Sequence, residues 1–318
     1  MKAAVRAAYG SAEVLSIQEI GKPVPKNNEV LIKVHATTVN RTDCGILWGK
    51  PFVIRFFTGL KRPKLAVTGT DFAGRIEAVG KDVTLFKEGE RVMGFGGMGI
   101  SSHAEHLVLP ETEAIVTIPE QQDYAEAAAC MEGAFYAACG VRGLQPRPDQ
   151  KALVYGATGA IGSATVQFLK YYGTYVTAVC SGEHRKLVQS LGADRIIDLK
   201  TEDFTKDQER YDFVIDAVGK SSFGKCKILL KDKGIYSSSD GFENLFLALV
   251  TSLSGGKKVV FDLPKNVKEG LIFIKGLVEK GKFKPLIDRS YPMDKVKEAF
   301  YYVNSGQKTG NVILTMDT

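Results

Sequence analysis

Tyr155-Gly156-Ala157-Thr158-Gly159-Ala160-Ile161-Gly162-Ser163 is the stretch of this sequence that decides the fold. It follows the apolar run 151–154, which predicts a short buried strand, and leads into 164–170, which predicts a helix. A strand, a glycine-spaced turn and a helix in this order form a dinucleotide cradle. Glycines let backbone N–H groups approach a pyrophosphate, and the helix N-terminus adds positive charge. We therefore predict cofactor contacts from Gly156, Ala157, Thr158, Gly159, Ala160, Ile161 and Gly162.

The spacing of these glycines, Gly-x-x-Gly-x-x-Gly, is not the common Gly-x-Gly-x-x-Gly, so the surrounding pattern has to support the cradle. From Asp123 onward strands and helices alternate, which predicts a parallel sheet wrapped by helices. The expected strands are 151–155, 175–180, 195–198, 212–218 and 234–238, and the expected helices are 160–171 and 183–191. The glycine turn follows the first of these strands, where the first βα turn of a dinucleotide-binding sheet belongs.

Before Asp123 the sequence alternates apolar and polar residues with a period of two, as in Val30, Ile32 and Val34, which indicates strands. Asp123 itself is placed to cap an alanine-rich helix. The other expected elements are strands at 72–79, 91–95, 104–109 and 311–315 and helices at 123–129, 267–278 and 293–303. The fold class we predict is α/β, a β-rich domain combined with a doubly wound parallel-sheet domain.

The composition limits the class of protein. The 318 residues are enough for two domains, and 44% hydrophobic with 25% charged residues is a globular balance. The net charge of +6 comes from 42 Lys and Arg scattered among 36 Asp and Glu, so we expect no nucleic-acid partner. Five cysteines without a Cys-x-x-Cys pair argue against a disulfide framework and a structural zinc site.

The apolar runs predict neither a signal peptide nor a membrane span. The chain starts without a long apolar run, and the longest one, 245–253, is too short to cross a bilayer. We therefore expect a cytoplasmic protein without an integral membrane segment.

The end of the second strand bears on which dinucleotide binds. An NAD site usually has an Asp or Glu there for the ribose 2′-OH, but this strand ends at Cys180 and Ser181, and Glu183 lies further into the turn. A small hydroxyl followed by Arg185 and Lys186 suits a 2′-phosphate. The sequence thus favours NADPH over NADH, although the two cations are also typical of a solvated helix face.

Six further stretches, in their order and spacing, carry a family resemblance. They are Val39-Asn40-Arg41-Thr42-Asp43; Gly69-Thr70-Asp71-Phe72-Ala73-Gly74 with Val79-Gly80; Gly89-Glu90-Arg91-Val92-Met93-Gly94; Leu191-Gly192-Ala193-Asp194; Tyr211-Asp212-Phe213-Val214-Ile215-Asp216; and Thr309-Gly310-Asn311-Val312-Ile313. Over nearly its whole length the chain resembles the medium-chain dehydrogenase/reductase superfamily, and most closely its zinc-free quinone oxidoreductase-like branch.

The resemblance implies a domain organisation. It implies a GroES-like catalytic domain at 1–122 and 268–318, a Rossmann NADP-binding domain at 123–267 and a cofactor cleft between them. It adds Val218, Gly219 and Asn311 as expected cofactor contacts. It also implies a homodimer through paired sheet edges, for which 258–261 is the candidate strand.

Zinc is not expected at the position where the superfamily's alcohol dehydrogenases bind it. Their catalytic ligands come from a Cys three residues before an aspartate and from a Gly-His-Glu triplet. The matching positions here are Asn40 and Gly69-Thr70-Asp71. The amide of Asn40 thus replaces the cysteine thiolate, and the hydroxyl of Thr70 replaces the histidine imidazole. Neither is a normal zinc ligand. We therefore predict a site that works without zinc.

Without a Lewis acid, simple alcohol oxidation loses its main catalyst, whereas a quinone or conjugated carbonyl accepts hydride more easily. Developing charge spreads to an oxygen that hydrogen-bond donors stabilise. The resemblance accordingly implies NADPH-dependent reduction of quinones or of the C=C bond of enones and enals. We expect Asn40 to position the substrate oxygen. Asp43 either holds this loop or forms an Asx turn, and Tyr136, where related sequences commonly have Thr, either donates a hydrogen bond or packs.

Other interpretations stay open. The absence of a firm acid–base residue is compatible with an NADPH-binding sensor or scaffold that catalyses little. Zinc-dependent alcohol oxidation through unexpected ligands is a third, disfavoured possibility. The aromatic stretch 48–57 either roofs an apolar substrate site or packs in a core or interface. The run 245–253 lines a cleft, forms a subunit contact or touches a lipid surface.

Overall fold

The computed structural model describes residues 1–238, 243–253, 255–261 and 266–316, and it divides into two compact units. Unit 1 comprises Met1–Glu132, Asn266–Glu279 and Ile287–Thr318, and unit 2 comprises Gly133–Lys265 and Lys280–Leu286. The division places 123–132 with the first unit and 280–286 with the second. The predicted domain limits, 1–122 with 268–318 and 123–267, stay a prediction.

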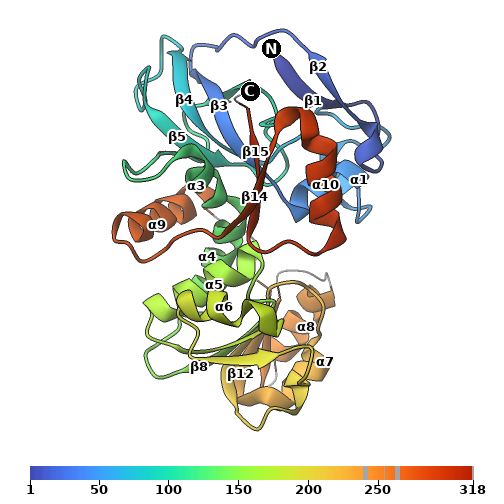
Figure 1. The fold of residues 1–318 in the computed structure, drawn as a ribbon, viewed down its shortest axis with the longest axis vertical. Coiled ribbons are helices and arrows are strands. Elements are labelled where there is room, and N and C mark those ends of the chain that lie inside the picture. Colours follow the sequence, from blue (N-terminus) through green and yellow to red (C-terminus); the bar gives the residue numbers. More distant parts are fainter. Residues whose placement is uncertain (239–242, 254, 262–265, 317–318) are drawn as a thin grey trace. The chain divides into compact units, whose positions relative to one another are not determined.

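Unit 1 is built on a mainly antiparallel sheet. Its strand order is β14-β15-β3-β4-β5-β7, and β6 pairs with β3 off this path. The strands are β3 (Glu29–Val39), β4 (Asp71–Val79), β5 (Arg91–Phe95), β6 (His106–Pro110), β7 (Ile115–Thr117), β14 (Ile287–Pro292) and β15 (Asn311–Thr315). Figure 1 shows the red C-terminal strands beside the blue β3, so both ends of the sequence build one sheet. A separate antiparallel pair joins β1 (Lys2–Arg6) to β2 (Leu15–Glu19).

Five α-helices of unit 1 surround this sheet among the described residues. They are α1 (Arg41–Trp48), α2 (Ile54–Thr58), α3 (Tyr124–Ala129), α9 (Val267–Glu279) and α10 (Val296–Ser305). The expected cap of α3 is confirmed, because the Asp123 carboxylate accepts a hydrogen bond from the Glu126 backbone N–H. α10 buries Val296, Phe300 and Val303 at helical spacing against the core that β3 and β4 supply.

Unit 2 is the predicted parallel sheet. Its strand order is β10-β9-β8-β11-β12-β13, and every pairing is parallel. The strands are β8 (Lys151–Tyr155), β9 (Tyr175–Cys180), β10 (Arg195–Asp198), β11 (Tyr211–Asp216), β12 (Leu230–Ser238) and β13 (Lys258–Val260). The helices are α4 (Glu132–Leu144, whose first residue lies in unit 1), α5 (Ala160–Tyr171), α6 (Arg185–Ser190), α7 (Phe223–Cys226) and α8 (Glu243–Ser252).

The differences from the sequence predictions are local. β11 ends at Asp216 rather than 218, and the helix expected at 183–191 splits into a 3₁₀ turn and α6. The sequence interpretation missed β14, because Asp288, Arg289 and Ser290 give it no apolar alternation. The run 245–253 lies in α8 except for Leu253, which follows the helix, and in the part of the chain that the structure describes no helix is long and apolar enough to cross a membrane.

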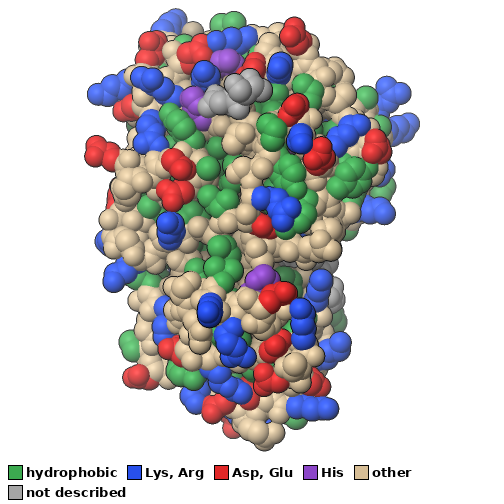
Figure 2. All heavy atoms as spheres, viewed as in Figure 1, with side chains coloured by type: hydrophobic (Ala, Val, Ile, Leu, Met, Phe, Trp, Pro, Cys, Tyr) green, Lys and Arg blue, Asp and Glu red, His purple; other side chains and the backbone are tan. Residues whose placement is uncertain are grey.

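The surface charge is mixed. On the face shown in Figure 2, Lys and Arg side chains alternate with Asp and Glu over both units. This distribution agrees with the scattered charges of the sequence.

All five cysteines are free thiols.

Candidate functional site

Asn40 ends strand β3 and caps helix α1. Its backbone is extended (φ −128°, ψ 179°), and its Oδ1 accepts a hydrogen bond from the Asp43 backbone N–H at 2.8 Å. In return, Asp43 Oδ2 accepts one from the Asn40 backbone N–H at 3.1 Å. This reciprocal capping box fixes both side chains in place. The local turn at Asn40 is therefore the first turn of a helix, which the sequence interpretation did not include.

The amide nitrogen of Asn40 faces two hydroxyl groups. Nδ2 donates to Thr70 Oγ1 at 2.9 Å and to Thr38 Oγ1 at 3.2 Å. Asn40 is 5% exposed and Thr70 is fully buried. The structure therefore brings together the two positions, Asn40 and Thr70, that the sequence singled out in place of zinc ligands.

Asp71 anchors this arrangement from strand β4. Its Oδ1 accepts from the Thr38 backbone N–H at 2.7 Å and from Thr37 Oγ1 at 3.0 Å, and the Thr38 hydroxyl donates to Oδ2. Burial raises the pKa of Asp71 to about 6, against the lowering effect of these hydrogen bonds. Because the Thr38 hydroxyl donates to Asp71, its lone pair is turned toward the Asn40 amide. A polarised chain thus runs from Asn40 through Thr38 to Asp71.

His103 lies beneath the same network. Its Nε2 is 2.9 Å from the Thr38 carbonyl oxygen and its Nδ1 is 2.8 Å from Thr68 Oγ1, which assigns the proton to Nε2. Burial lowers the pKa of His103 to about 4, so the imidazole is neutral at pH 7. Nε2 is 3.9 Å from Asp43 Oδ2. The sequence analysis did not single out His103 and so missed its place in the network.

The surroundings of the Asp43 carboxyl group favour its protonated form. Burial first, and then the charge of Asp71, raise the pKa of Asp43 well above its ordinary value. Its Oδ1 has no hydrogen-bond partner among the described residues. Asp43 therefore acts here mainly through Oδ2, which holds the Asn40 backbone.

Glu132 adds a third buried carboxyl group, at the start of α4. Thr42 Oγ1 donates to Glu132 Oε1 at 2.6 Å. Burial raises the pKa of Glu132 to about 7, and the charge of Lys308 opposes this rise. Lys308 Nζ donates to the Gly310 carbonyl at 2.6 Å, and burial lowers its pKa. No pattern in the sequence marked Glu132 and Lys308 as neighbours, because they are far apart in the chain.

These donors do not fit zinc. The amide of Asn40 and the hydroxyl of Thr70 are weak, neutral ligands for a cation that prefers thiolate, imidazole and carboxylate. Burial raises the pKa of the adjacent Cys44 thiol to about 12, so the thiolate is not available. Within the described ranges, no group of three or more His, Cys, Asp or Glu side chains is arranged to hold a metal ion.

The glycine turn of unit 2 has the geometry of a pyrophosphate cradle. Gly156 has φ +80°, and a Cβ on Gly162 would lie 2.1 Å from the Gly156 carbonyl oxygen. Gly159 caps α5 without a side-chain hydrogen bond. The first-turn N–H groups of α5, which have no intrahelical acceptor, are therefore not covered by a cap. A pyrophosphate fits this position.

The loop after β11 closes against this turn. A Cβ on Gly156 would lie 2.6 Å from Val218 Cγ1, so the two loops touch. Asp216 shapes the second loop, because its Oδ1 accepts from the backbone N–H groups of Val218 at 3.1 Å and Gly219 at 2.8 Å. The structure therefore brings Val218 and Gly219 to the cradle. Asp216, which organises them, was not among the predicted site residues.

The end of β9 carries more negative charge than the sequence suggested. Ser181 Oγ donates to Glu183 Oε1 at 2.8 Å, and Lys200 Nζ is 3.3 Å from the same oxygen. Asp198, at the end of the neighbouring strand β10, accepts from the Gly182 N–H at 2.9 Å. Hydrogen bonds lower the pKa of both carboxyl groups, led by those from Ser181 to Glu183 and from the Lys200 backbone to Asp198, so both are ionised at pH 7.

The sequence interpretation missed Asp198 and Lys200, which reach the Ser181 turn from the next strand. Parallel pairing places Asp198 beside Cys180. Arg185 and Lys186 follow at the start of α6. Two carboxylates and Lys200 therefore lie at the Ser181 turn, and Arg185 and Lys186 are next to it in the chain.

The two remaining predicted residues belong to different units. Tyr136 is half-buried on α4 in unit 2, and its ring centroid is 5.7 Å from that of Phe135. Asn311 begins β15 in unit 1, where antiparallel pairing of Val312 with Val39 brings it beside Asn40 at the end of β3. Their predicted roles stay predictions.

Comparison with known proteins adds the family. Residues 26–120 match the alcohol dehydrogenase GroES-like domain, and residues 191–314 match the family described as zinc-binding dehydrogenase. The chain belongs to the medium-chain dehydrogenase/reductase superfamily. It is 32% identical to the chloroplast envelope quinone oxidoreductase homolog of Arabidopsis thaliana, covering 96% of this chain and 95% of that protein. It is 30% identical to quinone oxidoreductase of Mus musculus, covering 97% and 96%.

These relatives confirm the quinone oxidoreductase-like branch of the superfamily that the sequence predicted. A plastid protein of Arabidopsis thaliana named NADPH-dependent alkenal/one oxidoreductase is 30% identical, covering 99% of this chain and 79% of that protein. The structure of a quinone oxidoreductase from Coxiella burnetii superposes with a TM-score of 0.90 at 24% identity, covering 100% and 99%. The expected GroES-like and Rossmann folds are thereby confirmed, and the superfamily makes this chain an oxidoreductase.

Proposed function

We propose that this protein is an NADPH-dependent, zinc-independent oxidoreductase that reduces quinones or the C=C bond of enones and enals. The observation that carries this proposal is the Asn40–Thr70 pair, a neutral hydrogen-bonding group where the superfamily's zinc enzymes have thiolate and imidazole. The glycine cradle of unit 2 supports the nicotinamide cofactor. The names of the quinone and alkenal/one reductases among the relatives support the substrate class.

Bound NADPH would supply the hydride, and the chain's own residues would position the acceptor. We assign Asn40 Nδ2 as the hydrogen-bond donor to the substrate oxygen. The substrate oxygen would replace the hydroxyl of Thr38 or Thr70 as the acceptor. Reduction places negative charge on that oxygen, and Asn40 stabilises the charge with an amide group that the capping box already holds in place. Asp43 would keep Asn40 in place rather than transfer a proton. Tyr136 stays a candidate for a second donor.

Stopped-flow oxidation of NADPH in the presence of benzoquinones and short enals tests the activity. We expect turnover with both acceptor classes and none with simple aldehydes, because a saturated carbonyl needs stronger activation. Tight NADPH binding without turnover on any acceptor would instead favour a sensor or scaffold. Stoichiometric metal in the active purified protein, with activity lost on chelation, would overturn zinc independence.

The preference for NADPH is proposed from the cations near Ser181. Arg185, Lys186 and Lys200 outnumber the two carboxylates there, which favours a 2′-phosphate. Arg185→Ala with Lys186→Ala should lower kcat/KM for NADPH about tenfold and leave that for NADH unchanged. Lys206→Ala, which removes an 82%-exposed lysine elsewhere in unit 2, is the matched control. Equal losses with both cofactors would contradict the assignment.

We also propose a homodimer through strand β13. β13 ends the strand order of unit 2 among the described strands, so its outer edge is the one predicted to pair with a second copy. Light scattering should give twice the chain mass, because pairing of two β13 edges joins two chains. A wild-type monomer would contradict the dimer.

The cytoplasmic location stays a prediction, since relatives include proteins named for the chloroplast.

A further inference from the structure

Residues 50–65, here called the α2 surface, expose an unusual number of large apolar side chains. They are Phe52 (60% exposed), Val53 (41%), Phe56 (60%), Phe57 (65%), Leu60 (52%) and Leu65 (42%). Single exposed apolar residues need no explanation, but a contiguous cluster marks an interaction site. Phe52 and Phe56 contact each other edge to face, with centroids 5.9 Å apart. These two rings thus form one exposed patch at the start of helix α2, and the other exposed apolar side chains lie in the same segment.

The same surface carries only positive charge. Lys50, Lys61, Arg62 and Lys64 are exposed, and no Asp or Glu occurs between Asp43 and Asp71. Elsewhere acidic and basic residues are interspersed, as on the face shown in Figure 2. An apolar patch rimmed by cations fits a partner that is apolar within and anionic at its surface.

Hydrogen bonds and ring contacts of Tyr9 and Arg55 hold the α2 surface in place. The Tyr9 hydroxyl is 2.8 Å from Thr58 Oγ1 and donates to the Gly59 carbonyl at 2.6 Å. Arg55 is turned inward, with its guanidinium 4.5 Å from the Tyr9 ring centroid and its Nε donating to the Gly49 carbonyl at 3.1 Å. These contacts fix the segment from within, so the outward phenylalanines do not serve the core of unit 1.

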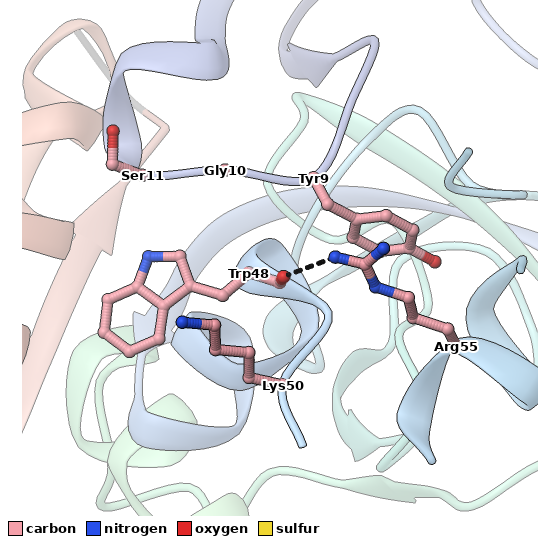
Figure 3. Close-up of a pocket in the computed structure, with 6 residues that line it drawn as sticks. All are labelled: Tyr9, Gly10, Ser11, Trp48, Lys50 and Arg55. Carbon is pink, nitrogen blue, oxygen red and sulfur yellow. Dashed lines mark hydrogen bonds between the residues drawn. The ribbon is translucent and has the colours of Figure 1, made fainter. Parts of the chain in front are cut away.

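A cavity of about 480 Å³ lies beside this surface and is lined by Tyr9, Gly10, Ser11, Trp48, Lys50 and Arg55. Figure 3 shows the Trp48 indole and the Lys50 side chain together on one side and the Tyr9–Arg55 stack on the other. Tryptophan and lysine are the residues that prefer the headgroup level of a bilayer. The cavity therefore continues the amphipathic character of the surface.

We propose that the α2 surface docks onto the surface of an anionic lipid bilayer, with its phenylalanines in the headgroup–acyl boundary and its cations among the lipid phosphates. Each Lys or Arg near such a surface contributes on the order of 1 kcal/mol, and exposed apolar area adds to this. Nucleic acid fits less well, because only the three phenylalanines could stack on bases, and the aliphatic Val53, Leu60 and Leu65 that complete the exposed set could not. A second copy of the chain fits less well, because like charges would face each other. The docking does not depend on the proposed reductase activity.

Vesicle co-sedimentation of the full chain tests this proposal. We expect binding to vesicles of phosphatidylcholine with phosphatidylglycerol, weak binding to phosphatidylcholine alone, and release at high salt. Lys61→Gln with Arg62→Gln, and separately Phe56→Ser with Phe57→Ser, should each weaken binding about tenfold or more. All four side chains are exposed, so the variants should keep the wild-type Tm. Phe246→Ser with Leu249→Ser on α8, which removes two equally exposed apolar residues (68% and 66%), is the matched control and should bind as wild type.

Three outcomes would overturn the docking proposal. One is equal affinity for neutral and anionic vesicles. Another is a raised KM for quinones in the Phe56/Phe57 variant with vesicle binding unchanged, which would make this surface part of the substrate site. The third is loss of the vesicle interaction in the α8 control, which would mean that any exposed apolar residue suffices. Absence of reductase activity would leave the vesicle result unaffected.

Discussion

The glycine cradle of unit 2 and the Asn40 cluster of unit 1 are organised in different ways. The cradle is built from backbone, and its residues are consecutive from Gly156 to Gly162, with one neighbouring loop added. The Asn40 cluster is built from side chains on β3, α1, β4 and the loop at His103. A backbone site tolerates change in side-chain chemistry but not in volume, whereas a side-chain site responds to both. Substitutions in the two regions should therefore separate binding from catalysis.

The largest effect is expected from Gly162→Ala. The added Cβ would lie 2.1 Å from the Gly156 carbonyl oxygen, a backbone atom that cannot move without opening the turn. We expect the Kd for NADPH, measured by nicotinamide fluorescence, to rise about a hundredfold. If the turn distorts instead, the free energy of unfolding of the unit should fall by about 3 kcal/mol. Gly159→Ala is the control, since its Cβ would lie 3.7 Å from the same oxygen and φ there is −71°. Similar Kd and Tm for both variants would show that the turn does not depend on close backbone approach.

An effect of similar size, but on kcat instead of cofactor binding, is expected from Asn40→Ser, which removes the amide but keeps a residue that caps helices well. With the Nδ2 donor gone, kcat for quinone reduction should fall about a hundredfold while the Kd for NADPH stays the same. Asn40→Ala should lose as much activity and in addition about 1 kcal/mol of stability, because the cap on Asp43 N–H is also lost. Unchanged kcat in the serine variant, measured with Tm as a check on folding, would remove Asn40 from the substrate site.

The contrast also explains how much the sequence could predict. The strands, the glycine turn and the parallel sheet depend on short-range periodicity and on glycines within a few residues, so they were predictable. Asn40 and Thr70 came from the resemblance. His103, Glu132 and Lys308 were not predictable as neighbours, because their contacts come from sheet register and helix packing rather than from spacing in the chain. Asp198 was missed for the same reason: only parallel pairing of β10 with β9 brings it to the Ser181 turn.

The smallest effect is expected from Glu132→Gln, which tests whether the charge of this buried carboxyl group next to the Asn40 cluster costs stability. The folded pKa of Glu132 is about 7, above the ordinary 4.5, so the folded state binds more protons than the unfolded state between these values. Its contribution to stability is therefore present at low pH and is lost as pH rises through about 7.

Gln keeps the acceptor for Thr42 Oγ1 and has no charge. The free energy of unfolding of the variant, relative to wild type, should thus increase by on the order of 2 kcal/mol from pH 5 to pH 8 in urea titrations. A pH-independent difference between wild type and Glu132→Gln would mean that Lys308 fully compensates the buried charge. Glu132 and Lys308 would then form an ion pair, and Glu132 would not be a protonated acid.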